Sequence, residues 1–170
     1  GTPDTTFGPL GCRKIHNQAG GNGNDCALTI KCIGTDIYVS GWSDSNDPGC
    51  TGTCRAMCVW KFLNDGSLDS AFGTGGCTSY INTALNHKNC VPKSMIITVG
   101  GKIVITGYVD DGSGCTLTCR SAVTIVLNSD GTFDTGFNAN GILDAGLAME
   151  SGYAMEMDGK LVILYVRHNG

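Results

Sequence analysis

An internal repeat with a spacing of 65 residues constrains the fold of this chain more than any other feature. Three phenylalanines lie 65 residues apart, and an aspartate precedes each by three positions: Phe7, Phe72 and Phe137 with Asp4, Asp69 and Asp134. Arginines and cysteines recur at the same spacing: Arg55 and Arg120, Cys12 and Cys77, Cys50/Cys54 and Cys115/Cys119. Self-similarity at a fixed period predicts one domain, residues 1–170, built from repeated supersecondary units.

Counted from phenylalanine to phenylalanine, the chain holds two complete units, 7–71 and 72–136, and a partial third, 137–170. The third unit stops one strand short. An unfinished unit leaves a sheet edge with unpaired N–H and C=O groups, which is a template for another chain. We therefore expect either a fragment of a longer array or copies that complete one another.

The local patterns predict strands throughout. "TDIYVSGW" (35–42), "GKIVITGY" (101–108) and "GKLVILYV" (159–166) are rich in β-branched and aromatic residues, and a glycine-containing turn precedes each. The segments before those turns, "CALTIKCI", "SMIITV" and "YAMEM", also suit strands, so three β-hairpins are expected. "RAMCVWKFL" and "SAVTIVL" predict a further strand in each complete unit. No segment has a sustained helical pattern, so an all-β fold with about four short strands per unit is expected.

The phrases "LNDGSLDSAFGTGG" and "GGKIVITGY" resemble the delta-60 type of bacterial repeat. In that family a phrase close to "DGSLDTSFG" ends one unit and one close to "DGKIVVAGY" forms the hairpin of the next. The resemblance implies units that look like β-propeller blades. A closed propeller needs about four to eight blades, so fewer than three units do not close into one from a single chain.

Alternation along the strands indicates which residues face the core. Cys58, Trp60 and Phe62 fall on one face of their strand, and the apolar face of "CALTIKC" is expected to carry Cys26, Leu28, Ile30 and Cys32. The predicted repeat core anchors are Phe7, Phe72, Phe137, Trp60 and Phe62.

The chain has ten cysteines, an even number well above ordinary usage, which favours an oxidising compartment. Repeat positions suggest the bridges Cys12–Cys26, Cys77–Cys90, Cys50–Cys54 and Cys115–Cys119, although sequence alone does not prove connectivity. Cys32 and Cys58 have no cysteine counterparts in the second unit, so they are expected to bond to each other. We thus expect a disulfide-stapled domain with all ten cysteines oxidised.

The charge and hydropathy of the chain argue against two classes of binding partner, nucleic acids and membranes. The net charge is -4 and no basic cluster occurs, which argues against nucleic acid, and no apolar run is long enough to insert into a membrane. The chain begins with Gly rather than Met, as expected for a processed, secreted protein. An extracellular location, either secreted or at the cell surface, is therefore expected.

No motif indicates catalysis or a cofactor. The three histidines, His16, His87 and His168, share no repeat position and no nucleophile pairs with them, so the chain is not expected to be an enzyme. Cys50, Cys54 and Cys58 lack the spacing of a zinc site. The Asp- and Asn-rich turns could offer oxygen ligands to calcium, but these residues are also what tight turns require. Threonine-bearing loops such as "PGCTGTC" could carry O-linked glycans.

Together these observations predict an extracellular structural protein whose copies join head to tail into a filament, through strand completion and hydrophobic docking. The alternative is a secreted propeller-like binding or adhesion module, with Trp42 or Tyr108 as a platform for carbohydrate, cut from a longer array.

Overall fold

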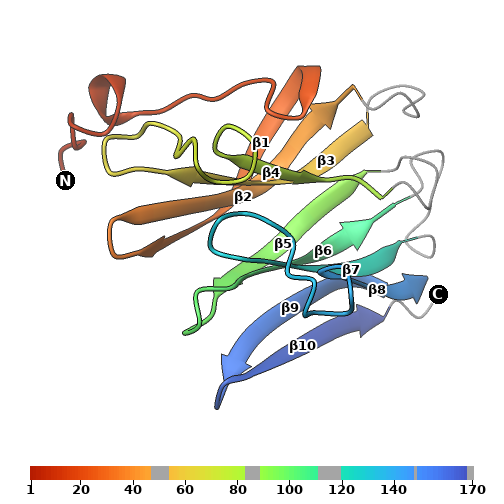
Figure 1. Cartoon of the computed structure of the whole chain (residues 1–170). Coiled ribbons are helices and arrows are strands. Elements are labelled where there is room, and N and C mark those ends of the chain that lie inside the picture. Colours follow the sequence, from red (N-terminus) through yellow and green to blue (C-terminus); the bar gives the residue numbers. More distant parts are fainter. Residues whose placement is uncertain (47–53, 83–88, 111–119, 148, 168–170) are drawn as a thin grey trace.

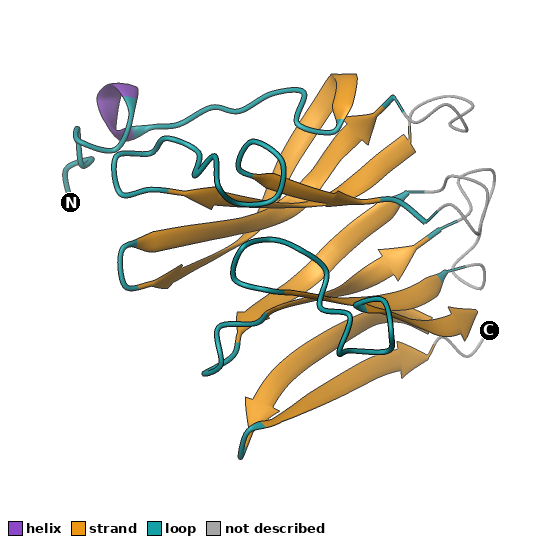
Figure 2. Cartoon of the chain, in the orientation of Figure 1, coloured by secondary structure: helices purple, strands orange, loops and turns teal. Residues whose placement is uncertain are grey.

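The computed structural model describes residues 1–46, 54–82, 89–110, 120–147 and 149–167 and shows an all-β chain (Figures 1 and 2). Its strands form three antiparallel sheets in which the strand order follows the sequence. The first sheet contains β1 (Gly20–Ile33), β2 (Asp36–Ser45), β3 (Cys54–Phe62) and β4 (Cys77–Tyr80). The second contains β5 (Cys90–Ile97), β6 (Ile103–Val109), β7 (Ser121–Leu127) and β8 (Ile142–Leu147). The C-terminal hairpin contains β9 (Met149–Met157) and β10 (Lys160–Arg167).

The expected hairpins are confirmed as the pairs β1–β2, β5–β6 and β9–β10. In the third, the turn residues Asp158 and Gly159 both have positive φ, 52° and 71°. Two successive positive φ angles match the right-handed twist of the flanking strands, and Asp-Gly is a sequence that tolerates them. The described residues contain one helical element, the 3-10 turn η1 (Pro9–Gly11).

The three sheets stack face to face (Figure 1). Tyr38, Met57 and Val59 of the first sheet form a core cluster with residues of the second sheet that include Ile105 and Ile125. The C-terminal hairpin packs on the opposite face of the second sheet. There the Thr106 hydroxyl donates to the Gly152 carbonyl at 2.5 Å, and Thr124 Oγ1 lies 2.8 Å from the hydroxyl of Tyr165.

The second sheet is thus covered on both faces, which explains its sequence. Every residue of β6 and β7 is buried, and both strands are short, nearly continuous apolar runs without alternation. The threonines at the hairpin interface, Thr106 and Thr124, are fully buried, and their hydroxyls have the hydrogen bonds that burial requires.

The outer face of the first sheet is covered by the N-terminal segment, residues 1–19. A second core cluster on this face contains Ala56, Cys58, Trp60, Phe62 and Cys77, and Ile15 and Ala19 of the N-terminal segment pack against it. The prediction that Cys58, Trp60 and Phe62 share a buried face of β3 is confirmed.

The expected apolar face of β1 is wrong. A register shift between Ala27 and Thr29 puts Cys26 opposite Trp42 and Cys32 opposite Ile37, so the two cysteines lie on opposite faces of the sheet. Leu28 and Ile30 are exposed. A β-bulge changes which side chains face the core, because alternation along a strand holds only while the pairing is regular.

Candidate assembly surface

The C-terminal hairpin has a free edge at β10. This strand pairs with β9 alone among the described residues, whereas β2 and β6 each pair with strands on both sides. The comparison is meaningful because "GKLVILYV" of β10 matches "GKIVITGY" of β6 position by position. The outer edge of β10 therefore presents backbone N–H and C=O groups without a strand partner among the described residues, whereas the same edge of β2 and of β6 is paired with the next strand.

One face of the same hairpin is apolar and exposed. This outer face consists of Tyr153, Met155, Met157, Val162, Leu164 and Val166, whose exposed fractions range from 37% to 64%. They share a face because Tyr153 pairs with Leu164 and Met155 with Val162 in the register. Half of the large apolar side chains that are exposed in the described residues lie here. Exposed apolar surface gathered on one face is typical of an interaction site.

The counterparts of these residues in the second sheet are covered. Val162, Leu164 and Val166 correspond to Val104, Thr106 and Tyr108, all of which are buried, with the C-terminal hairpin packed against their face. In the second sheet these positions are therefore buried by the next sheet of the stack. In the C-terminal hairpin the same positions are exposed.

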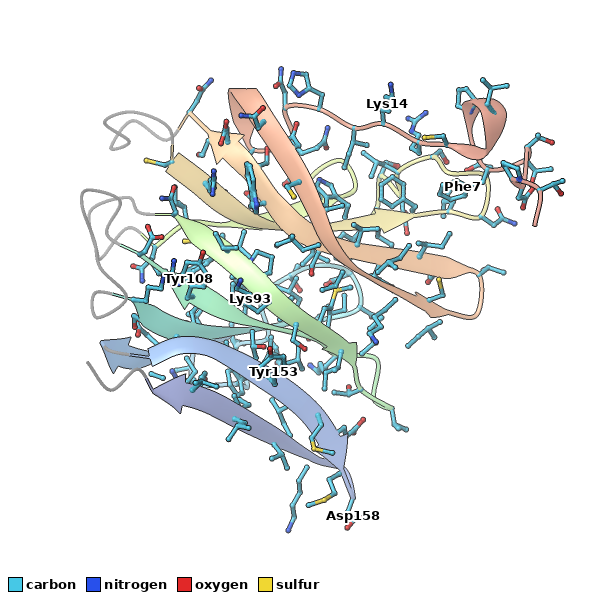
Figure 3. All side chains as sticks on the ribbon, turned by 180° about the vertical axis from the view of Figure 1, so that it is seen from behind. Phe7, Lys14, Lys93, Tyr108, Tyr153 and Asp158 are labelled. Atoms are coloured by element: carbon cyan, nitrogen blue, oxygen red, sulfur yellow. The ribbon has the colours of Figure 1, made fainter. Side chains whose placement is uncertain are left out.

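At the opposite end of the stack lies the N-terminal segment (Figures 1 and 3). Its Gly8 N–H donates to the Asp65 carbonyl at 3.0 Å. The corresponding bond in the interior of the chain runs from Gly73 to Asp130, at 2.8 Å. The N-terminal segment therefore contacts the first sheet as the turn around Phe72 contacts the second.

The three repeated phenylalanines differ in burial because their surroundings in the stack of sheets differ. Phe72 is 1% exposed and makes an edge-to-face contact with Tyr38, with ring centroids 6.0 Å apart. Phe7 and Phe137 are half-buried. Phe72 belongs to the core cluster between the two four-stranded sheets. Phe7 lies instead in the exposed N-terminal segment, and Phe137 lines an open pocket between the second sheet and the C-terminal hairpin. Trp60 and Phe62, the other predicted anchors, are both buried.

Three of the predicted disulfides are not formed. Cys12, Cys26, Cys32, Cys58, Cys77 and Cys90 are all free thiols, which corrects the expected bridges Cys12–Cys26, Cys77–Cys90 and Cys32–Cys58 and the expectation that all ten cysteines are oxidised. Cys50, Cys115 and Cys119 lie outside the described residues, so the bridges Cys50–Cys54 and Cys115–Cys119 stay predictions.

The sheet geometry explains why those pairs do not meet. Cys32 pairs with Ile37, which in turn pairs with Phe62, four residues along β3 from Cys58. That offset alone is roughly 13 Å, well beyond the reach of a disulfide. Cys77 belongs to the outer cluster of the first sheet, whereas Cys90 belongs to the cluster between the sheets. Cys26 shares a face with Trp42, and the N-terminal segment that carries Cys12 packs against the other face.

Cys58 and Cys77 instead form a buried thiol pair on the neighbouring strands β3 and β4. A hydrogen bond with Cys77, together with burial, raises the pKa of Cys58 well above its ordinary value. Burial raises the pKa of Cys90 to about 12. The thiols of Cys58 and Cys90 therefore remain protonated near neutral pH and behave as core side chains rather than as nucleophiles.

The two aromatic residues considered as sugar platforms contact cations of the protein itself. The Arg55 guanidinium lies 4.0 Å from the ring centroid of Trp42, and Arg120 lies 4.2 Å from that of Tyr108. Lys93 also approaches Tyr108, at 5.4 Å (Figure 3). Tyr108 is buried rather than exposed. The repeated arginines therefore stack on repeated aromatic positions, which sequence analysis found only as a spacing.

The predicted turns are built around aspartates. Asp65 and Asp130 each accept hydrogen bonds from the residue two positions later, Ser67 and Thr132, and those bonds lower the pKa of each carboxyl. This is the local turn chemistry expected from the sequence. No group of three or more His, Cys, Asp or Glu side chains in the described ranges is placed to hold a metal ion.

His16, the one histidine within the described residues, lies beside Asp25, with Nδ1 2.8 Å from Oδ2. Burial favours a higher pKa for Asp25, but hydrogen bonds with Ser43, His16 and the Asn17 N–H outweigh it and lower the pKa. Serine and histidine both contact the carboxylate, so the imidazole does not lie between them as it does in a catalytic triad.

Comparisons with protein-family models, curated proteins and solved structures found no match to this chain. The resemblance to the delta-60 repeat therefore stays a prediction. In the part of the chain that the structure describes, no helix has the length and apolar character needed to span a membrane.

Proposed function

We propose that this protein is the protomer of an extracellular filament, in which copies associate head to tail through the C-terminal hairpin of one and the N-terminal end of the next. The observation that carries the proposal is the combination, on one hairpin, of a free edge at β10 and an exposed apolar face. In this reading the two four-stranded sheets and the hairpin are tandem, propeller-blade-like repeat units of the delta-60 type, and the third unit is completed by another copy.

The physical argument rests on burial and on symmetry. Docking the outer face removes six large apolar side chains from water, and each Å² so buried contributes roughly 25 cal/mol before the cost of association. The surfaces involved lie at opposite ends of the stack (Figure 1). A contact between two different surfaces does not close into a dimer, so it generates a ring or an open filament.

A binding module is the less well supported reading. A cleft of about 520 Å³ lies between the N-terminal segment, β4 and the turn at Gly131–Phe133. The described residues that line it include Thr74, Thr78 and Thr132 but no tryptophan or tyrosine, the rings that usually provide a flat apolar platform. Trp42 and Tyr108 are engaged by arginines instead.

The test is the size of the native protein as a function of concentration, by sedimentation velocity and negative-stain electron microscopy. We expect species that lengthen with concentration. Leu164→Asp, which places a charge in the outer face, should yield monomers, and Val99→Asp, at a turn residue that is 98% exposed, should assemble like the wild type. A wild-type chain that stays monodisperse and monomeric at high concentration would refute the proposal.

A further inference from the structure

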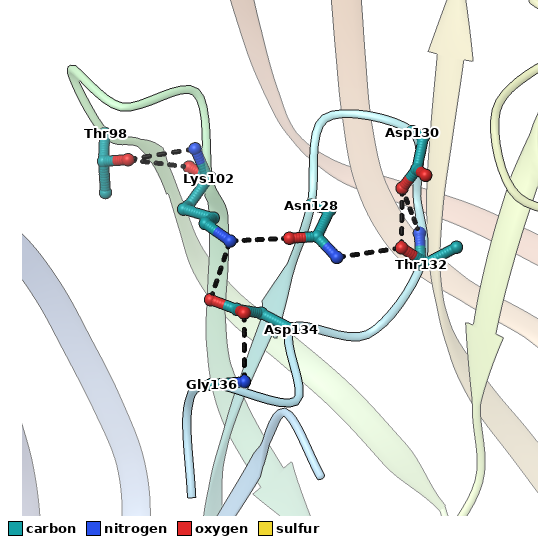
Figure 4. A network of polar contacts seen from close by, with 7 residues as sticks. All are labelled: Thr98, Lys102, Asn128, Asp130, Thr132, Asp134 and Gly136. Carbon is teal, nitrogen blue, oxygen red and sulfur yellow. Dashed lines mark hydrogen bonds and ion pairs between the residues drawn. The ribbon is translucent and has the colours of Figure 1, made fainter. Parts of the chain in front are cut away.

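An ion pair joins the hairpin of the second sheet to the turn that follows β7. Lys102, just before β6, has its ammonium 3.0 Å from Oδ2 of Asp134 (Figure 4). The other carboxylate oxygen of Asp134 accepts a hydrogen bond from the Gly136 N–H at 3.2 Å. Oδ1 of Asp134 therefore accepts a hydrogen bond within the turn, and Oδ2 pairs with the lysine.

The same division occurs at Asp69, the counterpart of Asp134 in the first sheet. Oδ1 accepts from the Ala71 N–H at 3.1 Å, and Oδ2 lies 2.9 Å from the ammonium of Lys61. Asp4 is the third member of this series. Its Oδ1 accepts from the Thr6 N–H at 2.9 Å, whereas its Oδ2 contacts no cation of the described residues.

The lysine of the third hairpin lacks a carboxylate. Lys160 occupies in "GKLVI" the place that Lys102 has in "GKIVI". It pairs with Met157 in the register, which puts it on the outer face of the hairpin, and it is exposed. Its ammonium contacts no acidic group of the described residues.

A carboxylate without its lysine thus lies at one end of the molecule, and a lysine without its carboxylate lies at the other. The turn around Asp4 already contacts the first sheet as the turn around Asp69 contacts the second, through Gly8 and Asp65. Among the described residues, no hairpin packs on the turn around Asp4 as the β5–β6 hairpin packs on the turn around Asp134, and no turn of this series packs on the C-terminal hairpin.

We propose that Lys160 of one copy pairs with Asp4 of the next, which reproduces between protomers the contact that Lys102 and Asp134 make within the chain. This inference rests on the proposed function and names the residues that set the register of the assembly. Within the chain the ammonium of Lys102 also donates to Asn128 Oδ1, at 2.6 Å. The pair between protomers would therefore reproduce the ion pair with the turn carboxylate but not this additional hydrogen bond.

The same placement brings Phe7 of the second copy to the outer face of the first. In the first sheet Phe72 packs on Tyr38, and in the second Phe137 and Val104 line one shallow pocket. Val162 holds the position of Tyr38 and Val104. Phe7, which is half-buried, and Val162, which is 37% exposed, would therefore cover each other.

Charge exchange tests the pairing. Lys160→Asp opposes two aspartates at the contact and Asp4→Lys opposes two lysines, so each variant alone should associate at least tenfold more weakly than the wild type. An equimolar mixture of the two variants should assemble again as an alternating copolymer, since every mixed contact then joins a lysine to an aspartate. Lys31→Asp, at an exposed lysine of β1, is the matched control and should assemble like the wild type.

The outcomes separate this inference from the proposed function. A wild-type chain that never associates overturns both. If the wild type assembles and both single variants assemble equally well, the Lys160–Asp4 pair is wrong while the filament proposal stands. Weak single variants that are not rescued by mixing also overturn the pair, because they show that each substitution acts through something other than its opposite charge.

Discussion

The ammonium of Lys61 lies 2.9 Å from Oδ2 of Asp69, which ties strand β3 to the turn that follows it. The same ammonium lies 2.9 Å from Asp36, on β2. The Lys61 side chain is 14% exposed, whereas the side chains of Asp36 and Asp69 are 38% and 19% exposed, so a largely buried lysine holds two carboxylates that still contact solvent. In the second sheet Lys102 makes the equivalent connection to the turn from the neighbouring strand, since the Lys61 position there is Val126.

Replacing this lysine should destabilise the protein. Lys61→Met keeps the apolar stem but leaves the carboxylates of Asp36 and Asp69 without their cation, which we expect to lower the free energy of unfolding by about 1–2 kcal/mol. Urea denaturation measures the change. Lys31→Met, at an exposed lysine of β1 in the same sheet, should change it by less than about 0.5 kcal/mol. Equal effects of the two substitutions would contradict the assigned role of Lys61.

The turn carboxylates should make stability depend on acidic pH. A hydrogen bond from Lys61 lowers the pKa of Asp69, and one from Lys102 lowers that of Asp134. Because the folded pKa lies below the unfolded one, the stabilisation is present above the unfolded value near 3.8 and is lost as pH falls below it. We expect a melting temperature nearly constant from neutral pH to about pH 5 that declines on further acidification.

The pH test has its own control. Asp134→Asn removes one titrating group, so its melting temperature should decline less steeply on acidification than that of the wild type. A variant profile parallel to the wild-type profile would show that the acid sensitivity arises elsewhere.

The three repeated phenylalanines should differ in their contribution to stability despite equivalent positions in the sequence. Phe72→Ala removes a side chain that is 1% exposed and should cost about 3–5 kcal/mol. Phe7→Ala and Phe137→Ala remove half-buried rings, and each should cost less than Phe72→Ala when measured on the monomer. A Phe7→Ala effect as large as that of Phe72→Ala would mean that the N-terminal turn is more deeply packed than the structure shows.

The strands and hairpins could be predicted because their signals are local. The runs "GKIVITGY" and "GKLVILYV" contain both the β-branched residues and the turn glycine that define a hairpin. The bulge in β1 had no such signal. Gly41, opposite the bulge, lies so close to the Cys26 carbonyl that a Cβ would approach it within 1.8 Å, and this proximity exists only once β1 and β2 have paired.

The candidate assembly surface was only partly predictable, because it too depends on how elements distant in the sequence pack together. The incomplete third unit was visible in the repeat count, but the apolar outer face requires knowing which side of β9 and β10 the second sheet covers. The Lys102–Asp134 pair does have a signal in the sequence, since lysine recurs at Lys160 in the hairpin phrase and aspartate recurs at Asp4 before the phenylalanine. Disulfide pairing failed because repeat spacing does not say on which face of a sheet a cysteine lies.

Thiol reactivity gives a direct test of the corrected cysteine assignment. Cys12 and Cys32 are exposed free thiols, whereas Cys58, Cys77 and Cys90 are buried. Because the thiolate is the reactive form, raising a thiol pKa from 9.0 to about 12, as at Cys90, lowers the reactive fraction near neutral pH by about a thousandfold. We expect Cys12 and Cys32 of the native protein to be alkylated rapidly and the three buried thiols to react only after unfolding.

Differential alkylation with two isotopic forms of one reagent, the first added to native protein and the second after denaturation without reductant, measures this at each residue by peptide mass spectrometry. Protein unfolded before the first addition is the control, and there all six thiols should react at similar rates. Rapid native labelling of Cys90 would contradict its burial. Failure of Cys12, Cys26 or Cys32 to react even after denaturation would show that these cysteines are bridged in the native material, as the repeat pattern alone had suggested.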